Sequence, residues 1–469
     1  MGPAGFLFES KGSMFFAKSM QDLDYLLGVM NSKSVNYALK VLAPTLDFHE
    51  GPVSKTPIVT LPSECRQIVE SNVDSLVLMA RVDWDSYETS WKFVVNPLVA
   101  ARNVSGASDE SEFQLSTLYV AVRERWAKNC EEMRRLETEN NRIFIEAYGL
   151  QDELTPEVPW HEITLTCNPW YRYGVKVDSG QCAVGSAASD HCTLPTDHLL
   201  EERLKGDTVK ELISYAVGCM MGRYSLEKPG LVLADQGATL ADYERVVSGE
   251  CAVVSGECSM GGADHSSLTT AHFAPDEDGI IPILDNDWFA DDIVTRFKEF
   301  IKVAFGEVHF FENMAWIEEA LGKNLRDYFT KDFYKDHLQR YQNRPIYWLF
   351  QSPKGAFRAL VYMHRYKPDM VGGVLGYLRS LQTKVENQLG VAMQIASDES
   401  KSNSERVRAN KDVVKFSKAK KELDEYEKNV LYPLSTERIE IDLDDGVKVN
   451  YAKFASALAK VKALEAKGE

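Results

Sequence analysis

The sequence lacks a glycine-rich cofactor loop. Although the chain contains 29 glycines, no two of them are separated by a single residue, so no G-x-G motif occurs. Loops of that kind approach the phosphates or the sugar of a cofactor closely because glycine has no side chain. Its absence argues against a cofactor-binding catalytic core within this chain.

Long apolar runs and targeting signals are also missing. No apolar run approaches the roughly 18 residues that a membrane-spanning helix needs. The first residues, Met1–Phe6, offer neither an apolar signal-peptide core nor the hydroxyl residue of a myristoylation site. The eight cysteines are scattered and do not form the pattern of a secreted disulfide framework. Together these absences predict a cytoplasmic location and no membrane contact.

The chain has fewer basic than acidic residues. The chain has 53 Lys and Arg against 70 Asp and Glu, and its net charge is −17. Such a balance argues against a protein that coats nucleic acid over its whole surface. One interval reverses it, because eight cations and only Asp332 and Asp336 occur between Lys331 and Lys367. A nucleic-acid function would therefore depend on this local surface.

The basic interval contains a predicted β-hairpin over residues 344–366. Two runs of aromatic and β-branched residues flank Ser352-Pro353-Lys354-Gly355, in which Pro at the second position and Gly at the fourth are typical of a type I turn. Strand alternation gives the hairpin one apolar face, with Trp348 and Phe350, and one face of basic and aromatic tips. Cations beside aromatic rings suit a phosphate backbone and bases. The alternative is a core hairpin whose charges are only solvated.

Helical periodicity dominates the rest of the chain. Helices are expected at residues 22–42, 113–148, 208–221, 291–305, 312–321, 324–340 and 451–466, and a long helical hairpin at 371–396 and 405–431. Strands are expected at 5–16 and 162–174, and a second β-hairpin at 439–450, turning at Asp445-Gly446. The fold class is therefore α+β.

Asn168-Pro169-Trp170-Tyr171 resembles the Asn-Pro-Pro-aromatic tetrapeptide of amino-methyltransferases, whose Asn and aromatic ring hold a flipped base. Here Trp replaces the second Pro, and the glycine loop is missing. We predict that the segment is a strand end without a catalytic role, while Arg172 and Tyr173 stay candidates for ligand contact. A complete methyltransferase that uses this tetrapeptide is the rival interpretation.

Two segments, 175–198 and 246–273, are rich in Cys, His, Gly and Ser and are predicted to be inserted, mobile loops. Cys251, Cys258, His265 and His272 recur every seven residues. Zinc sites usually use closely spaced ligand pairs, so spacers of six residues favour a polar loop over a metal site. We assign no metal ligands, and zinc remains the alternative.

Six segments together resemble one family. They are Gly5–Gly12, Leu26–Lys33, Asp83–Trp91, Gly222–Ala234, Arg344–Gly355 and Ile441–Asn450. In this order they are similar to the C-terminal part of the PglX family, the adenine-specific DNA methyltransferases of BREX phage-exclusion systems. The likeness covers nearly the whole chain except the two Cys/His-rich insertions.

The resemblance implies a division of labour. In that family the methyltransferase core, with its S-adenosylmethionine loop, lies upstream of the part that this chain resembles. The chain is therefore expected to recognise DNA sequence in phage defence and host DNA modification, with no catalytic or cofactor-binding residues of its own and no activity alone. The implied partners are double-stranded DNA, the methyltransferase core, and other BREX proteins or phage inhibitors. A non-catalytic scaffold of a phage-defence complex is the alternative.

With this resemblance the chain divides into four expected parts. They are entry strands and helix (1–62), a target-recognition domain with both insertions (63–274), a helical region with the basic hairpin (275–370), and a helical-hairpin spacer with a terminal β-hairpin and helix (371–469). The expected DNA contacts are Arg344, Lys354, Arg358, Tyr347, Arg365, Arg172 and Tyr173.

Overall fold

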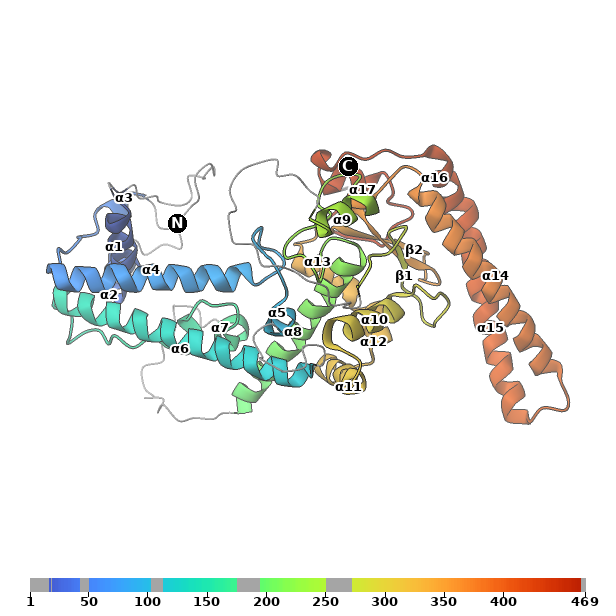
Figure 1. Ribbon diagram of the computed structural model, residues 1–469, viewed down its shortest axis with the longest axis horizontal. Coiled ribbons are helices and arrows are strands. Elements are labelled where there is room, and N and C mark those ends of the chain that lie inside the picture. Colours follow the sequence, from blue (N-terminus) through green and yellow to red (C-terminus); the bar gives the residue numbers. More distant parts are fainter. Residues whose placement is uncertain are drawn as a thin grey trace. The chain divides into compact units, whose positions relative to one another are not determined.

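In the described residues helices dominate, and one small antiparallel sheet accompanies them (Figure 1). The computed structural model describes residues 17, 19–42, 50–102, 113–174, 195–249 and 272–464. The α+β class is confirmed. The expected strand pair at 5–16 and nearly all of the two insertions lie outside the described residues. None of the helices described is both long enough and apolar enough to cross a membrane.

The chain forms two compact units. Unit 1 comprises residues 1–87 and 120–204, and unit 2 comprises residues 88–119 and 205–469. Helices α6 (Leu115–Tyr148) and α8 (Pro195–Met220) each contribute residues to both units. The four-part division expected from the sequence stays a prediction.

Unit 1 is helical in its described part. Besides portions of α6 and α8 it contains α1 (Met20–Asn31), α2 (Lys33–Leu42), α3 (Glu50–Ser54), α4 (Ser63–Asp85), the 3₁₀ turn η2 (Trp160–Glu162) and α7 (Pro169–Tyr173). Its core joins α1, α4 and α6 through Val29, Val69 and Phe144, all fully buried. Gly28 allows the close approach of α1 to α4, because a Cβ atom there would lie 2.7 Å from Val69 Cγ1.

The strand predicted over residues 162–174 is wrong, because η2 ends at Glu162, residues 163–168 are irregular and α7 occupies Pro169–Tyr173. Asn168 is fully buried, and its side chain accepts a hydrogen bond from the Trp170 N–H at 3.2 Å. Its amide group donates to the carbonyls of Trp160 and Ile163, both at 2.8 Å. Asn at the N-cap and Pro at the first helical position both favour a helix start. The polar groups of Asn168 are thus used for local structure.

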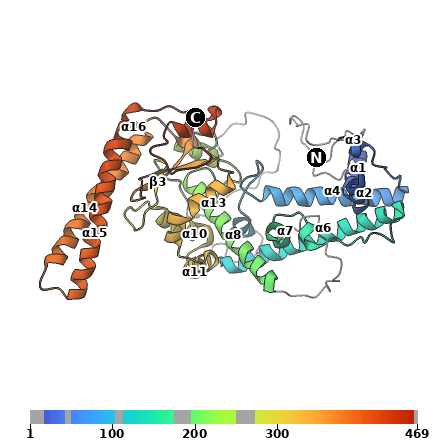
Figure 2. The same cartoon turned by 180° about the vertical axis from the view of Figure 1, so that it is seen from behind.

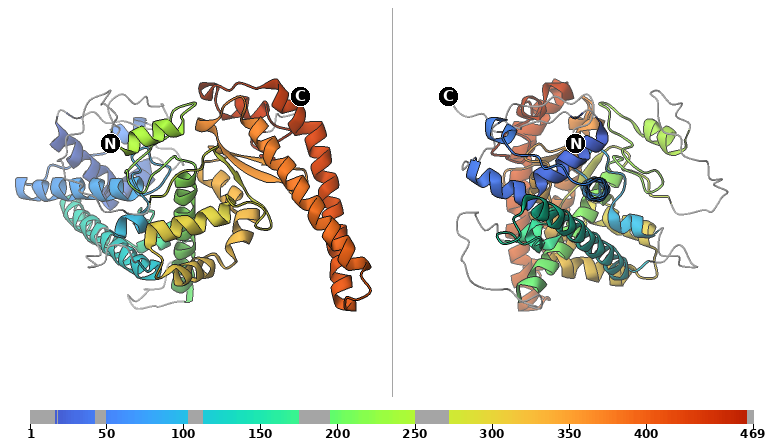
Figure 3. Two further views of the ribbon diagram at one scale, coloured as in Figure 1. Left: turned by 45° about the vertical axis from the view of Figure 1, so that its right-hand side comes forward. Right: turned by 90° about the vertical axis from the view of Figure 1, so that its left-hand side faces the viewer.

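Unit 2 holds the sheet and the remaining helices. Its elements are α5 (Pro97–Ala101), α9 (Leu240–Val247), β1 (Ile280–Pro282), α10 (Ile293–Phe305), α11 (Phe310–Leu321), α12 (Leu325–Lys331), α13 (Phe333–Arg340), β2 (Tyr347–Gln351), β3 (Arg358–Tyr362), η3 (Met363–Arg365), α14 (Met370–Ser397), α15 (Asn403–Tyr426), the π-helical turn η4 (Glu427–Leu431), α16 (Tyr432–Glu437), η5 (Leu443–Asp445) and α17 (Val447–Ala452). Figures 1, 2 and 3 show α14 and α15 side by side along their length, so the predicted helical hairpin is confirmed.

The predicted β-hairpin of β2 and β3 is confirmed, and a third strand extends it. The strand order is β1-β3-β2, and Val361 of β3 pairs with both Ile280 and Trp348. The expectation that one face presents aromatic tips to a ligand is wrong, because Tyr347 and Tyr362 of that face are buried, whereas Arg358 is half-buried. Trp348 and its neighbours pack against α14 and the C-terminal segment, where Trp348 meets Tyr451 and Phe454 edge to face at 5.3 and 5.5 Å.

The opposite face of the sheet is buried as well. Tyr347 and Tyr362 lie on it with ring centroids 5.4 Å apart, and Tyr347 also contacts the ring of His337 on α13 at 4.9 Å. A strand covered on both faces cannot present its aromatic tips to a ligand, whatever its alternation.

The second predicted β-hairpin, at 439–450, is wrong, since η5 and α17 replace it. The Asp442 carboxylate accepts from the Asp444 N–H at 2.9 Å and starts a 3₁₀ turn. Gly446 then adopts φ +82° at the start of α17, and the Asn450 side chain bonds the backbone of Asp442. These side chain–backbone bonds outcompete the ladder that the Asp-Gly pair suggested.

Candidate nucleic-acid interface

A groove of about 920 Å³ in unit 2 lies between the hairpin turn, α12 and α15. Seven cationic residues line it: Arg326, Lys331, Lys354, Arg358, Lys411, Lys415 and Lys418. The acidic residues in its lining are Asp285, Asp327 and Glu422. We call this groove, with the cationic and acidic lining residues just named, the basic groove. Its excess of positive charge contrasts with the net charge of −17 of the whole chain.

The hairpin turn forms one wall of the basic groove. The Gly355 N–H donates to the Ser352 carbonyl at 2.9 Å, which closes the predicted turn. Gly355 has φ +79°, and a Cβ atom there would lie 2.3 Å from Arg358 Nη2. Glycine is therefore required at position 355 for two reasons. The backbone is left-handed there, and the Arg358 guanidinium fills the space that a Cβ atom would occupy.

Glu422 of α15 binds this turn directly. Its Oε1 atom accepts from Ser352 Oγ at 2.6 Å, from the Lys354 N–H at 2.7 Å and from the Ala356 N–H at 3.3 Å. A single carboxylate oxygen thus holds three donors of the turn. Because charge-assisted hydrogen bonds are the stronger kind, this contact fixes the turn against α15.

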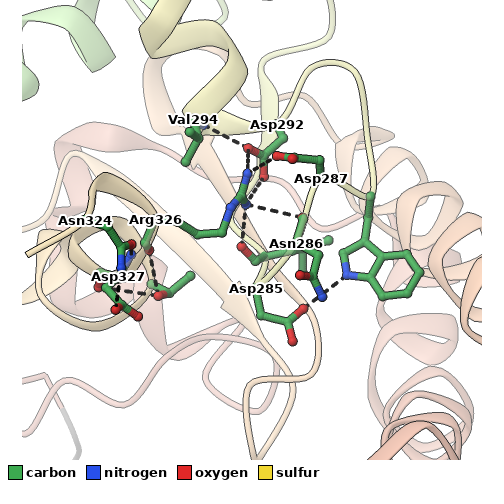
Figure 4. A network of polar contacts seen from close by, with 11 residues as sticks. Asp285, Asn286, Asp287, Asp292, Val294, Asn324, Arg326 and Asp327 are labelled. Carbon is green, nitrogen blue, oxygen red and sulfur yellow. Dashed lines mark hydrogen bonds and ion pairs between the residues drawn. The ribbon is translucent and has the colours of Figure 1, made fainter. Parts of the chain in front are cut away.

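Arg326 is committed to the protein rather than to the groove. Figure 4 shows its guanidinium between Asp287 and Asp292. It donates at 3.0 Å to both carboxylate oxygens of Asp292 and at 2.7 Å to the Leu284 carbonyl. The Asp292 side chain is 1% exposed, and burial raises the pKa of this carboxyl group although Arg326 opposes the shift. The network holds the loop before α10 in place as part of the wall.

The lysines of α15 form the opposite wall. Lys411, Lys415 and Lys418 are spaced i, i+4 and i+7 and therefore share one face of the helix. Lys415 Nζ contacts Asp285 at 2.9 Å, and the Lys331 ammonium on α12 contacts Asp327 at 2.6 Å. The sequence-based choice of contact residues missed this helix, although its lysine spacing was readable.

Four groove cations form no ion pair in the part of the chain that the structure describes, although the charges of Asp285 and Glu422 act on Arg358. Over the described ranges, Lys354, Lys411 and Lys418 make no ion pair. The Arg358 guanidinium is half-buried and bonds only neutral acceptors, Gln351 Oε1 at 3.2 Å and the Thr330 carbonyl at 3.0 Å. Such cations can bind an anion without first breaking a salt bridge.

The remaining predicted contacts in unit 2 have different environments. Arg344 is exposed just before β2 and is not part of the groove lining. Tyr347 is fully buried, and its N–H donates to His337 Nε2 at 3.3 Å. Burial lowers the pKa of His337 to about 3, so this ring is neutral.

Arg365 is also buried, and it donates to the carbonyls of Asp276 and Glu277 at 2.7 and 2.9 Å. The side chains of Tyr347 and Arg365 are therefore not available to a ligand at the surface.

Arg172 and Tyr173 belong to α7 in unit 1. The Arg172 guanidinium lies 5.5 Å from the centroid of the Tyr87 ring, and Arg203 lies 4.5 Å from that of Tyr173. They form a cluster of their own. Of the cysteines and histidines in the two insertions, His198 and His272 are described, and His272 contacts Glu227. The other members lie outside the described residues.

Two curated relatives match nearly the whole chain, and both are adenine-specific methyltransferases. One is the adenine-specific methyltransferase BrxX of Escherichia coli O9:H4 (strain HS), which is 33% identical over 481 residues, 98% of this chain and 35% of the relative. The other is the adenine-specific methyltransferase PglX of Lacticaseibacillus casei (strain Zhang), 32% identical over 467 residues, 96% of this chain and 33% of the relative.

The resemblance to PglX is thereby confirmed. The chain spans about a third of the length of the relatives that it matches. No family model matches the chain.

Proposed function

We propose that this chain is the DNA sequence-recognition portion of a BREX adenine-specific DNA methyltransferase. It acts in the cytoplasm, in phage defence and host DNA modification, together with a methyltransferase core that this chain does not contain. The observation that carries the proposal is the basic groove, where seven cations outnumber three acids, in an otherwise acidic chain whose relatives are adenine-specific methyltransferases.

Charge distribution supports DNA as the partner. Affinity for a duplex comes largely from cations that neutralise phosphates and release counterions. An acidic protein with one basic groove is repelled by the duplex in most orientations and attracted in the one that presents the groove. Lys354 and Arg358 are the first contacts proposed, together with Arg344 at the other end of the hairpin and Arg172 and Tyr173 on the other unit.

A binding assay tests this function. Fluorescence anisotropy with a labelled 30-base-pair duplex should show binding that weakens steeply between 50 and 200 mM salt. A control titration with a labelled, uncharged polymer in place of the duplex should show no binding. Absence of duplex binding at low salt, combined with tight binding to other proteins of the defence system, would replace the DNA reader by the scaffold.

The proposal also predicts which activities the chain lacks on its own. Because the chain has no G-x-G loop, the chain alone should neither bind S-adenosylmethionine nor methylate DNA. Calorimetry with the cofactor and a methylation assay with radiolabelled methyl groups measure both. Stoichiometric, micromolar cofactor binding would contradict the assignment of the core to another part of the protein.

A further inference from the structure

The basic groove has two walls that are far apart in the sequence. One is the hairpin turn with Lys354, and the other is the lysine face of α15. The C-terminal end of α15 is anchored by Leu423 and Tyr426, which are buried in the core that also contains Trp348. The lysine face is therefore carried by a helix fixed at its C-terminal end.

Glu422 sets the separation of the two walls. Its carboxylate lies one turn beyond Lys418 on α15 and holds three donors of the hairpin turn. Its negative charge is satisfied by backbone and hydroxyl donors, so it does not need a lysine as partner. The other acids of the lining, Asp285 and Asp327, are paired with Lys415 and Lys331. Among the described residues, Lys354, Lys411 and Lys418 face the groove without an ion-pair partner.

The groups that remain suit phosphates better than base edges. Base edges are read by amide, guanidinium or ammonium donors, and the planar amide and guanidinium groups make the more directional pairs. The Asn324 side chain is already bonded to Asp327 through both of its polar atoms, and Trp288 Nε1 donates to Asp285 at 3.1 Å. What is left is chiefly ammonium groups, which bind phosphate as point charges.

The spacing along α15 also fits a nucleic-acid strand. Lys411 and Lys418 are seven residues apart, a rise of roughly 10 Å along the helix. One strand of a duplex carries a charge about every 3.4 Å of its axis, so a helix lying along that axis would cover about three phosphates over this distance.

We propose that the basic groove clamps the phosphodiester backbone of duplex DNA between the hairpin turn and α15, through Lys354 on one wall and Lys411 and Lys418 on the other. Arg358 adds a fourth cation beside the turn. The clamp contacts phosphates and does not read bases. This inference rests on the proposed function and assigns α15 to the DNA-binding surface.

The test compares two triple variants of the full chain with equal loss of charge. The groove variant is Lys354→Gln, Lys411→Gln and Lys418→Gln. The control variant replaces Lys448, Lys460 and Lys462 with Gln. These are exposed lysines of unit 2 outside the groove lining. All six side chains are exposed, so both variants should keep the circular dichroism spectrum and melting temperature of the parent.

Anisotropy titrations over a series of salt concentrations give the slope of log affinity against log salt. For the groove variant this slope should fall in magnitude by roughly 2.7, which is 0.9 for each of three lost contacts. Its affinity at 100 mM salt should drop at least tenfold, and by the same factor on two duplexes of unrelated sequence. The control variant should keep the parental slope within about one contact.

Each outcome has a distinct meaning. If the parent binds DNA and both variants keep its slope, the clamp is wrong and the proposed function stands with another surface. If both variants lose the same slope, only net charge matters, and the clamp is again wrong. A loss on one sequence only would indicate base reading and contradict the phosphate clamp. If the parent itself binds no duplex, the proposed function fails first.

Discussion

Replacing Glu422 with Ala removes the carboxylate that ties the hairpin turn to α15. The carboxylate oxygen holds the Ser352 hydroxyl and two backbone N–H groups of the turn, those of Lys354 and Ala356. A hydrogen bond to a charged group contributes about 1.5–3 kcal/mol. The three bonds share one oxygen, and the exposed Lys354 N–H regains water, so their sum overstates the effect. We expect a loss of about 2–4 kcal/mol in the local stability of the turn.

Hydrogen exchange measures this local stability. In the parent protein the amides of Lys354 and Ala356 should be protected, because each donates to Glu422. Since 1.4 kcal/mol corresponds to a factor of ten, their exchange in Glu422→Ala should accelerate by roughly 30-fold to several hundred-fold. A peptide covering residues 350–357, followed by mass spectrometry, reports both amides. Glu422→Gln keeps an acceptor oxygen and should restore part of the protection.

The matched control is Glu425→Ala on the same helix. Glu425 is exposed, and its carboxylate makes only a 3.9 Å contact with Lys421. Its replacement should leave exchange in the turn unchanged. If Glu422→Ala also leaves the peptide protected, the turn is held by its own backbone bonds, and the reasoning that Glu422 fixes the groove walls is refuted.

Three other predictions concern stability, pH and metal. Trp348→Ala should cost about 3–5 kcal/mol of unfolding free energy, because Trp348 is 2% exposed in the core of unit 2. The control Trp91→Ala should cost little, because the Trp91 side chain is 95% exposed. Equal denaturation midpoints of the two variants would contradict this prediction. Burial, reinforced by Glu162, raises the pKa of Glu137 from 4.5 to about 7, so the unfolded chain ionises first and stability should fall as the pH rises from 4.5 to 7. Glu137→Gln should remove this fall and gain up to about 3 kcal/mol at pH 8 but nothing at pH 4, as urea titrations at both pH values would reveal. Elemental analysis should find well under one zinc per chain, and a stoichiometric zinc whose loss in Cys251→Ser unfolds the protein would overturn that prediction.

Turn chemistry was readable where local sequence decides the structure. Pro353 and Gly355 specified the hairpin turn, and the periodic apolar residues of α14 and α15 specified the helical hairpin. The same kind of reading failed at Asp442–Asn450, where an Asp-Gly pair suggested a β-turn. There the side chains of Asp442 and Asn450 bond the backbone and make 3₁₀ and α-helical turns instead. Local signals of equal strength compete at such sites, and packing selects between them.

Burial of the candidate residues could not be read in the same way. Alternation correctly separated the two faces of β2, but it does not reveal whether a second layer covers the polar face. Tyr347 is enclosed because α13 brings His337 onto it, and Arg365 because the segment before β1 offers two carbonyls. An arginine in a basic interval has the same sequence signature whether it contacts solvent or, like Arg365, is buried and donates hydrogen bonds to backbone carbonyls.

By itself, the sequence determined the α+β class, the basic hairpin, the helical hairpin and the resemblance to the PglX methyltransferases, because each depends on local periodicity, turn residues or ordered motifs. Only the tertiary structure decided which cations form a site. It joins Ser352 and Lys354 to Glu422, about 70 positions away in the chain, and places the lysines of α15 across a groove from the turn. Contacts over such distances depend on how the sheet and α14–α15 pack around a common core, and no local pattern encodes that packing.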